Sequence, residues 1–464
     1  MFNLIDLVGS ISDWMWGPPM LMFIVGGGIF LTVRLGFFQI IYYPYILKQT
    51  FGTIFKKSKG EGTVSPFQAA TTALASTIGA SNIVGVPIAI AFGGPGAVFW
   101  MGVISLIGCA TKFSEIVLGV KYRVRNEDGQ YVGGPMYYLS AGFPDKTIGE
   151  TLGVVYAFFT MLILAASVAA QSVSATQTVG VMGVSSLTTG ILLTILVSII
   201  AYGGITRIAS VTSKLVPLMA GVYIAGSLIV ILCNITAIPE VFILIFQSAF
   251  SPSATAGGLT GFGAASAMRW GIARGTYSCE AGMGTAPVAH SAAATDHPVR
   301  QGFWGIFEIT VSSLIICTMS ALVVLTTGIW NQVDAASAAS MPTLAFQSVL
   351  GHTLGGLLVS FSMLMFVIST IIVQVFYGEK QCEFFFGTKI AKILKVFYIL
   401  AILAGALGGL QAVFGFLDVV MGITIIPNML GLIFMSGQVA ALKKEFFSGS
   451  KYYLKDKRRS RSSL

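Results

Sequence analysis

Residues 76–87 read STIGASNIVGVP, a stretch that is apolar enough to enter a lipid bilayer but contains two glycines, a proline and several polar side chains. A second interrupted segment, SCEAGMGTAP, occupies residues 278–287. Backbone groups cannot stay unpaired in lipid, so a helix that breaks at membrane depth survives only where it lines a cavity or binds something. Two such breaks, in corresponding places of two halves, are typical of the substrate site of a transporter.

The composition places the whole chain in a membrane. Of its 464 residues, 55% are hydrophobic and only 10% are charged, and the mean hydropathy is +0.85. These values exclude a soluble globular domain of this length. At roughly 20 apolar residues per spanning helix, the chain has room for about ten or more spans. The five cysteines are scattered without a CxxC pair, so neither a disulfide framework nor a thiolate metal site is indicated.

Hydrophobic runs predict an all-α polytopic membrane protein with about eleven transmembrane helices. The spans lie near residues 20–33, 66–92, 97–120, 152–170, 187–202, 215–232, 265–289, 302–328, 353–377, 390–413 and 416–442. Lysine and arginine follow the odd-numbered spans, so the positive-inside rule places the N-terminus outside and the C-terminus in the cytoplasm of a plasma-membrane protein. The net charge of +9 therefore indicates loops beside anionic lipid rather than a nucleic-acid partner.

The position of the breaks divides the chain. One extra N-terminal span followed by two sets of five puts a broken segment at the start of each set. Because five is odd, the second set must be inverted relative to the first, which predicts a five-plus-five inverted repeat. The expected divisions are a lead-in with the first span and a cytoplasmic loop, 1–64; the first repeat, 65–235; an extracellular connection with the second repeat, 236–442; and a basic cytoplasmic tail, 443–464.

The first break offers two kinds of polar group at membrane depth. Where the helix restarts after Ser81 and Asn82, unpaired amides and the positive end of the helix dipole form a seat for a carboxylate. The preceding half-helix ends in free carbonyls between Ala75 and Ile78, which suit Na+ or an ammonium group. One broken helix can therefore hold both ends of an amino acid, or its carboxylate and a coupling ion.

Small residues in these breaks have an alternative explanation, because glycine is common where membrane helices pack closely. The glycines that allow close approach of the backbone to a ligand are Gly79, Gly282 and Gly284. Polar Thr77, Asn82 and Glu280 cluster in the same two segments. Their presence favours binding over packing alone.

Ionisable residues inside the membrane are costly and are usually functional. Glu280 sits at the second break and is the best candidate for a gate, a helix-end orienter or a proton site. Lys112 and Glu115 lie three residues apart on one helical face, so we expect a structural ion pair near the cytoplasmic surface.

Two arginines, Arg269 and Arg274, precede the second break on the outer half of the span. They could pair with Glu280, Glu308 or Asp418, or guard the outer vestibule. The sequence does not choose among these partners.

Hydroxyl and imidazole groups give weaker signals. Ser369 and Thr370 interrupt an apolar span, and an isolated pair of this kind commonly bonds its own helix carbonyls. His290 and His297 are expected in a cytoplasmic connection with Asp296. Without further cysteine or histidine ligands, we do not expect a zinc site there.

Several ordered motifs resemble the alanine or glycine:cation symporters, also called the sodium:alanine symporter family. The matching stretches are SPFQA at 65–69 leading to TIG at 77–79, GGPGAVFW at 93–100, GGPMYY at 133–138, RWGIARG at 269–275, EAGMGTAP at 280–287, TDHPVRQG at 295–302 and YGEK at 377–380. Because they spread over nearly the whole chain, the match is far more specific than any single motif.

The resemblance implies the five-plus-five fold that is shared with a bacterial leucine transporter, and secondary transport of small neutral amino acids with Na+. It implies a substrate site formed by Thr77, Gly79, Ala80, Ser81, Asn82, Gln171, Cys279, Glu280, Gly282 and Gly284. By analogy with the shared fold, Na+ would bind the carbonyls of Ala75 and Ile78 and the hydroxyls of Ser369 and Thr370.

The two breaks also depart from the pattern of the family. Residues 79–82 read GASN where the family usually reads GTGN, and residues 278–282 read SCEAG where it usually reads SNEAG. The chain therefore lacks a threonine hydroxyl, gains a serine side chain and replaces an asparagine amide. All three changes act on the expected pocket, so they bear on the preferred substrate rather than on the class of transport.

The leading hypothesis is a symporter that moves a small neutral amino acid inward, alanine or glycine first, driven by the sodium gradient. Glutamine, serine or another amino acid is the alternative substrate, and H+ through Glu280 is the alternative ion. A membrane-embedded enzyme would need a base placed against a nucleophile, and Glu280 with His290 or Cys279 forms no such constellation in the sequence. A ligand sensor would need a signalling domain, which the short basic tail does not provide.

Overall fold

Helices make up most of the computed structural model, which describes residues 14–54, 60–180, 184–251, 263–408, 411–448 and 452–453. The expectation of an all-α architecture is confirmed. The regular strands of the described residues are β1 (Val124–Arg125) and β2 (Tyr131–Val132), which pair antiparallel as a short hairpin. Most of the basic tail, from residue 454 onward, lies outside the described residues.

The α-helices range from 4 to 55 residues. Their bounds are α2 Pro18–Arg34, α3 Phe38–Ile41, α4 Tyr43–Thr50, α5 Pro66–Thr77, α6 Val86–Gly93, α7 Ala97–Lys121, α8 Pro135–Gly142, α9 Lys146–Gly180, α10 Ser186–Ala201, α11 Gly204–Cys233, α12 Ile238–Phe250, α13 Ala264–Cys279, α14 Ala286–His290, α15 Pro298–Ile309, α16 Thr318–Thr326, α17 Met341–Leu350, α18 His352–Ala406, α19 Gln411–Phe434 and α20 Ser436–Ser448. Two π-helical turns, η2 (Ser81–Gly85) and η4 (Thr310–Cys317), join α5 to α6 and α15 to α16.

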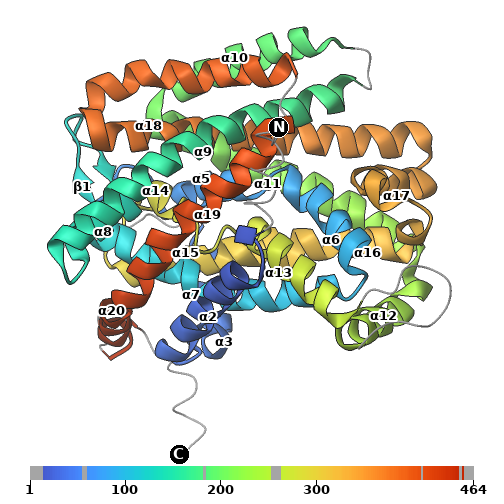
Figure 1. Ribbon diagram of the computed structural model, residues 1–464, viewed down its shortest axis with the longest axis horizontal. Coiled ribbons are helices and arrows are strands. Elements are labelled where there is room, and N and C mark those ends of the chain that lie inside the picture. The colour runs from blue at the N-terminus through green and yellow to red at the C-terminus, as the bar shows by residue number, and fades with distance from the viewer. Residues whose placement is uncertain are drawn as a thin grey trace, which may run out of the picture.

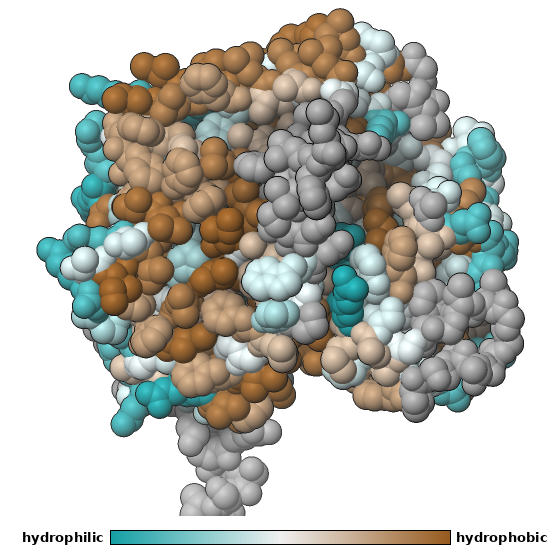
Figure 2. All heavy atoms as spheres, in the orientation of Figure 1, coloured by the Kyte–Doolittle hydropathy of each residue, from teal (hydrophilic) through white to brown (hydrophobic). Residues whose placement is uncertain are grey.

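The apolar segments of the sequence form helices of different lengths, and those of α2, α10 and α12 are shorter than a full span. Within the described residues, five helices are long and apolar enough to cross a membrane, and up to seven if each of two bent pairs counts as one span. Helices α9, α10 and α18 lie side by side, with the β1 hairpin and α8 at one end of the molecule and α12 and α17 at the other (Figure 1). Hydrophobic residues cover the middle of the face in Figure 2, and hydrophilic ones gather mainly towards its two ends.

The predicted ninth and tenth spans correspond to the two helical halves of α18, which are separated by a non-helical residue, Gly387, where φ is +75°. Glycine alone takes this backbone conformation without strain, so the chain can turn there without a loop. The predicted connection after the sixth span contains a further apolar helix, α12, which packs on α7 and α13.

The first interrupted segment breaks where the sequence predicts it. A capping box between Ser65 and Gln68 starts α5, and Ile78 leaves the helix with ψ of +93°. The chain re-enters as the η2 turn, and the two halves are bent by 55°. Pro87 follows at the start of α6, where its missing amide costs little.

The second interrupted segment opens into a loop between α13 and α14. Glu280 ends α13 in the left-handed conformation, with φ of +50°. Gly282 and Gly284 follow with φ of +93° and +74°. A non-glycine residue rarely holds this conformation, so tertiary contacts must stabilise Glu280 there.

The basic loops meet on one face, as their distribution in the sequence predicts. Arg123 donates to the carbonyls of Glu61 and Ala293, at 2.8 and 2.6 Å. Lys392 pairs with Asp128 at 2.8 Å. We call this the basic face; it carries the loops around residues 60–65, 122–132 and 291–297 and the part of α18 around residues 380–395. On it, a hydrogen bond from Tyr131 and the charge of Arg125 lower the pKa of the exposed Glu61 carboxyl.

Candidate functional site

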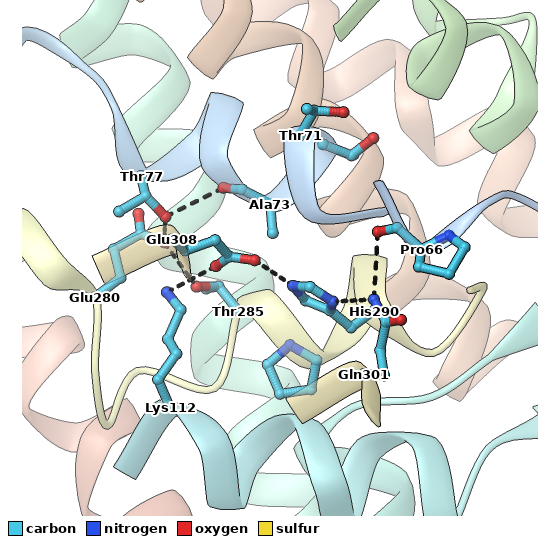
Figure 3. A network of polar contacts seen from close by, with 12 residues as sticks. Pro66, Thr71, Ala73, Thr77, Lys112, Glu280, Thr285, His290, Gln301 and Glu308 are labelled. Atoms are coloured by element: carbon cyan, nitrogen blue, oxygen red, sulfur yellow. Dashed lines mark hydrogen bonds and ion pairs between the residues drawn. The ribbon is translucent and has the colours of Figure 1, made fainter. Parts of the chain in front are cut away.

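The two breaks meet inside the molecule through Glu280 (Figure 3). Thr77, at the end of α5, donates its hydroxyl to Glu280 Oε2 at 3.3 Å, and Thr285 donates to the same oxygen at 3.0 Å. These two contacts hold the carboxylate between the segments and explain its strained backbone. Of the roles that the sequence left open for Glu280, the geometry favours that of a helix-end orienter.

The first break is held together from within by Asn82. Its Oδ1 accepts the amide of Gly79 at 3.1 Å, and its Nδ2 donates to the carbonyl of Ser312 at 3.3 Å. Ser320 donates to the carbonyl of Asn82 at 2.8 Å. The Asn82 side chain is fully buried. Its amide group is therefore occupied by protein contacts and fixes the shape of the break.

The four residues named for sodium converge at one point. The hydroxyls of Ser369 and Thr370 lie 3.3 and 3.1 Å from the carbonyl oxygen of Ala75, and Thr370 Oγ1 lies 3.4 Å from that of Ile78. Both hydroxyls also contact the carbonyl of Phe366 on their own helix, at 2.8 and 2.9 Å. Neutral oxygens that gather in this way are suitable ligands for a small hard cation.

Gly79 lies beside this oxygen cluster and beside Gln171 of α9. A Cβ atom at Gly79 would lie 3.1 Å from Thr370 Oγ1 and 3.5 Å from Gln171 Nε2. Among the described residues, the buried Gln171 Oε1 has no hydrogen-bond partner. A buried polar atom without a partner is costly and indicates a place that a ligand or water completes.

A cavity of about 640 Å³ reaches the first break, and its lining includes residues of α17, at the end of the molecule opposite the β1 hairpin (Figure 1). Ala80 and Ser81 line its inner end, and residues of α9, α13, α17 and α18 form its walls. Ligand pockets of this size hold molecules larger than a small amino acid. Of the expected substrate residues, Ala80 and Ser81 are thus the ones in contact with this open space.

Residues 278–287 of the second break do not line that cavity, and α7 holds them in place. Lys112 Nζ donates to the carbonyl of Cys279 at 3.1 Å. Glu115 Oε1 accepts the amides of Gly282 and Gly284, each at 3.0 Å, and the side-chain amide of Asn428 at 2.7 Å. A cation thus caps the end of α13 and an anion binds the following amides, so each charge matches the local backbone dipole.

The expected ion pair between Lys112 and Glu115 is therefore wrong. Lys112 pairs instead with Glu308 of α15 at 3.6 Å, and all three side chains are fully buried. Their spacing on α7 does place them on one side of that helix, but each finds a stronger partner on another segment. The i, i+3 rule describes isolated helix surfaces and loses its force where a helix is buried on many sides.

Three expected substrate residues lie apart from the group around Ser81 in this conformation. The Cys279 side chain is buried against Gly108 of α7. Gly282 and Gly284 lie against Met429 of α19 and against Pro135 and Tyr156, respectively. Their contacts are those of a supporting scaffold.

His290 does not lie in an open connection, which corrects the expectation from the sequence. It ends α14, is fully buried, and contacts Glu308 through Nε2 (Figure 3). Gln301 contacts His290 Nδ1 at 2.7 Å and the carbonyl of Pro66 at 3.5 Å. A polar chain thus runs from Lys112 to the first residue of α5. Within the described part of the chain, no group of three His, Cys, Asp or Glu residues could hold a metal ion.

The outer arginines take different positions. Arg274 lines the cavity, with its guanidinium 5.6 and 5.8 Å from the ring centres of Trp270 and Tyr277. Arg269 is exposed. Glu280 and Glu308 are bonded elsewhere, and the Asp418 side chain lies outside the described residues. Of the roles expected for Arg274, the described geometry therefore favours that of guarding the outer vestibule.

Sequence reasoning missed the scaffold around the second break. From the sequence, Glu308 is expected only as a partner for arginine and Gln301 only as part of a family motif, and nothing is expected of Asn428 or Ser312. Glu308, Asn428 and Ser312 are polar side chains within apolar segments, which is the signal that identifies such residues.

Comparison with known proteins agrees with this geometry. The sequence model of the sodium:alanine symporter family matches residues 1–460 of this chain. The chain is 48% identical over 462 residues to an uncharacterized transporter of Bacillus subtilis, covering 99% of this chain and 97% of the relative. It is 39% identical over 449 residues to the sodium/alanine symporter AgcS of Methanococcus maripaludis, covering 96% and 97%.

A solved structure shares the fold. A Na+-coupled sialic acid symporter in a substrate-bound outward-open state aligns with a TM-score of 0.52 at 12% identity, covering 88% of this chain and 82% of that one. At this identity the likeness concerns the arrangement of helices alone. The sequence match covers almost the entire chain and therefore identifies the family as well as the fold. This protein is a membrane transporter that belongs to the sodium:alanine symporter family.

Proposed function

We propose that this protein imports a small neutral amino acid, alanine or glycine, together with Na+ by alternating access. The observation that carries the proposal is the convergence of the Ala75 and Ile78 carbonyls with the Ser369 and Thr370 hydroxyls, directly beside Gly79 and Gln171. An ion at the oxygen cluster would lie next to a ligand at the break, so each would stabilise the binding of the other.

The proposed substrate site comprises the first break, Gln171 and the Glu280 contact. The positive end of the η2 and α6 dipole would face the carboxylate of the amino acid. The carbonyls at the end of α5, which Ser369 and Thr370 contact, would face its ammonium group or the sodium ion. In this proposal Cys279, Gly282 and Gly284 shape the site through Glu280, and Lys112 and Glu115 hold them in place.

The topology of the proposal follows the distribution of charge. We assign eleven spans in a five-plus-five inverted repeat, with the basic face in the cytoplasm and the N-terminus outside. The interlocked loops of the basic face and the open cavity on the other side then correspond to a conformation that is closed towards the cytoplasm.

Uptake into proteoliposomes tests the proposal. Labelled alanine is supplied under an inward Na+ gradient, with a K+ gradient as control and a panel of unlabelled amino acids as competitors. Sodium-dependent accumulation is expected, and the strongest competitor identifies the substrate. Folded protein that accumulates no amino acid under a sodium gradient would contradict the proposal. Uptake driven by a proton gradient alone would instead support the alternative of H+ coupling through Glu280.

The serine at the inner end of the cavity is expected to influence which amino acid is accepted. Ser81 lines the cavity and donates only a long contact, 3.4 Å, to Asn82. Ser81→Gly removes its side chain and should let bulkier amino acids compete severalfold better, because space opens at the break. The competition profile of the variant checks this prediction, with Ser174→Ala on the cavity wall as the matched control. An unchanged profile would leave Ser81 without a role in selection.

A further inference from the structure

We infer that Arg274 forms an outer subsite that holds the carboxylate of the incoming amino acid before it reaches the break. The inference rests on the proposed function and concerns the route to the site rather than the site itself. The cavity of about 640 Å³ contains Ser81 and Arg274 in one continuous lining. It has room for an amino acid in transit in addition to one at the break.

The charged residue in the lining of the cavity is positive. The lining contains Arg274 and His352, and among the described residues it contains no aspartate or glutamate. Arginine stays charged at every physiological pH. A concave, partly enclosed space with charge of one sign concentrates ligands of the opposite sign. The cavity therefore attracts the carboxylate end of a zwitterion and orients it with that end towards Arg274.

Aromatic rings hold the guanidinium of Arg274 in position, but no carboxylate of the described residues neutralises its charge. Trp270 and Tyr277, one turn before it and one turn after it on α13, offer ring contacts at 5.6 and 5.8 Å. No carboxylate of the described residues lies within ion-pair distance of it. Aromatic contacts orient the charge without using its hydrogen-bond donors in the way that a carboxylate would. The paired N–H donors of the Arg274 guanidinium therefore remain available to bind a carboxylate.

The position of Arg274 along α13 fits a step on the path. It lies on α13, which packs against η2, and it lines the same cavity as Ser81 of the first break. An amino acid held at Arg274 by its carboxylate would have its ammonium group towards the break and the carbonyls of α5. Release from Arg274 would then precede seating at the amides of η2.

Kinetics of uptake test this subsite. Arg274→Gln is expected to raise the alanine concentration for half-maximal uptake about tenfold, with the maximal rate changed by less than about twofold. Arg274→Lys keeps the charge but not the fork, so it should recover part of the loss. Arg269→Gln, an exposed site on the same helix, should behave as the wild type. An unchanged half-saturation in Arg274→Gln overturns the inference while leaving the proposed function intact.

A second measurement does not depend on transport, so it distinguishes failure of the Arg274 subsite from failure of the proposed function. Ser360 lines the same cavity, and Cys233 is the exposed native cysteine among the described ones, so Ser360→Cys is made in a Cys233→Ser background. Each labelling rate is divided by the rate of the same reagent with a free small thiol, because an anionic thiolate reacts intrinsically faster with a cationic reagent. By this ratio a sulfonate-bearing methanethiosulfonate reagent should be favoured over a trimethylammonium one at the introduced thiol, and Arg274→Gln should remove the preference. Equal ratios in the parent overturn the inference, whether or not the protein transports alanine.

The same labelling distinguishes the substrate from chloride, which shares the anionic chemistry. Alanine should slow labelling by the sulfonate reagent when uncharged mannitol replaces most of the chloride salt, and Arg274→Gln should abolish this protection. Protection by chloride but not by alanine would identify a halide site and overturn the assignment to the substrate. Preserved labelling preference together with no sodium-dependent uptake would count against the proposed function.

Discussion

Replacing Ser369 and Thr370 together with alanine is expected to raise the Na+ concentration for half-maximal uptake by about tenfold or more. Both hydroxyls lie within 3.4 Å of carbonyl oxygens from the first break, so the double variant removes two of the four oxygens named for the ion. Each tenfold change corresponds to about 1.4 kcal/mol of binding free energy. Initial rates of alanine uptake at a series of Na+ concentrations, with ionic strength held constant by choline, measure the shift.

The control for this experiment lies on the same helix. Ser362 is buried on α18, and its hydroxyl has no hydrogen-bond partner among the described residues. Ser362→Ala therefore removes a buried hydroxyl without touching the oxygen cluster. Its sodium dependence should match the wild type. If the double variant folds well and keeps an unaltered sodium dependence, the two hydroxyls serve only their own helix, through Phe366.

The breaks themselves were predictable because their signal is local. Glycine, proline and polar residues within an apolar run report a helix that cannot continue, and this holds for both segments. The oxygen cluster was placed only by resemblance, since nothing near Ser369 in the sequence points to Ala75, 294 residues away. The prediction that the basic loops share one side came from charge alone, because lipid electrostatics act on each loop separately, and the cytoplasmic location of that side stays a prediction.

The partners inside the membrane were not predictable from spacing. Lys112 and Glu115 suggested each other because they are close on one helix, yet their contacts lie 167 residues or more away along the chain. Local rules cannot rank such partners, since the ranking depends on which segments the fold brings together. The left-handed Glu280 illustrates the same limit, because its conformation is stabilised by Thr77 on the other broken segment.

Lys112→Met is expected to have the largest effect on stability of any single change at the site. Lys112 and Glu308 are both fully buried, and removing the ammonium leaves a carboxylate whose nearest other contact is His290. Loss of one partner from a buried pair typically costs about 3–5 kcal/mol. The variant also leaves the end of α13 without its cap at the Cys279 carbonyl. Thermal unfolding of purified protein in detergent should show a clearly lower midpoint, and uptake should be lost.

A double variant separates charge from shape. Lys112→Met combined with Glu308→Gln removes both charges while keeping side chains of similar volume, so the cost of an uncompensated carboxylate disappears. We expect the double variant to regain most of the unfolding midpoint, but not sodium-dependent uptake, because the carbonyl of Cys279 still lacks its donor and Glu280 follows it directly in the chain. Recovery of neither property would mean that Lys112 acts mainly on Glu280 or Glu115. Recovery of uptake as well would mean that the second break needs no cap, and that Thr77 and Thr285 are sufficient to hold Glu280 in place.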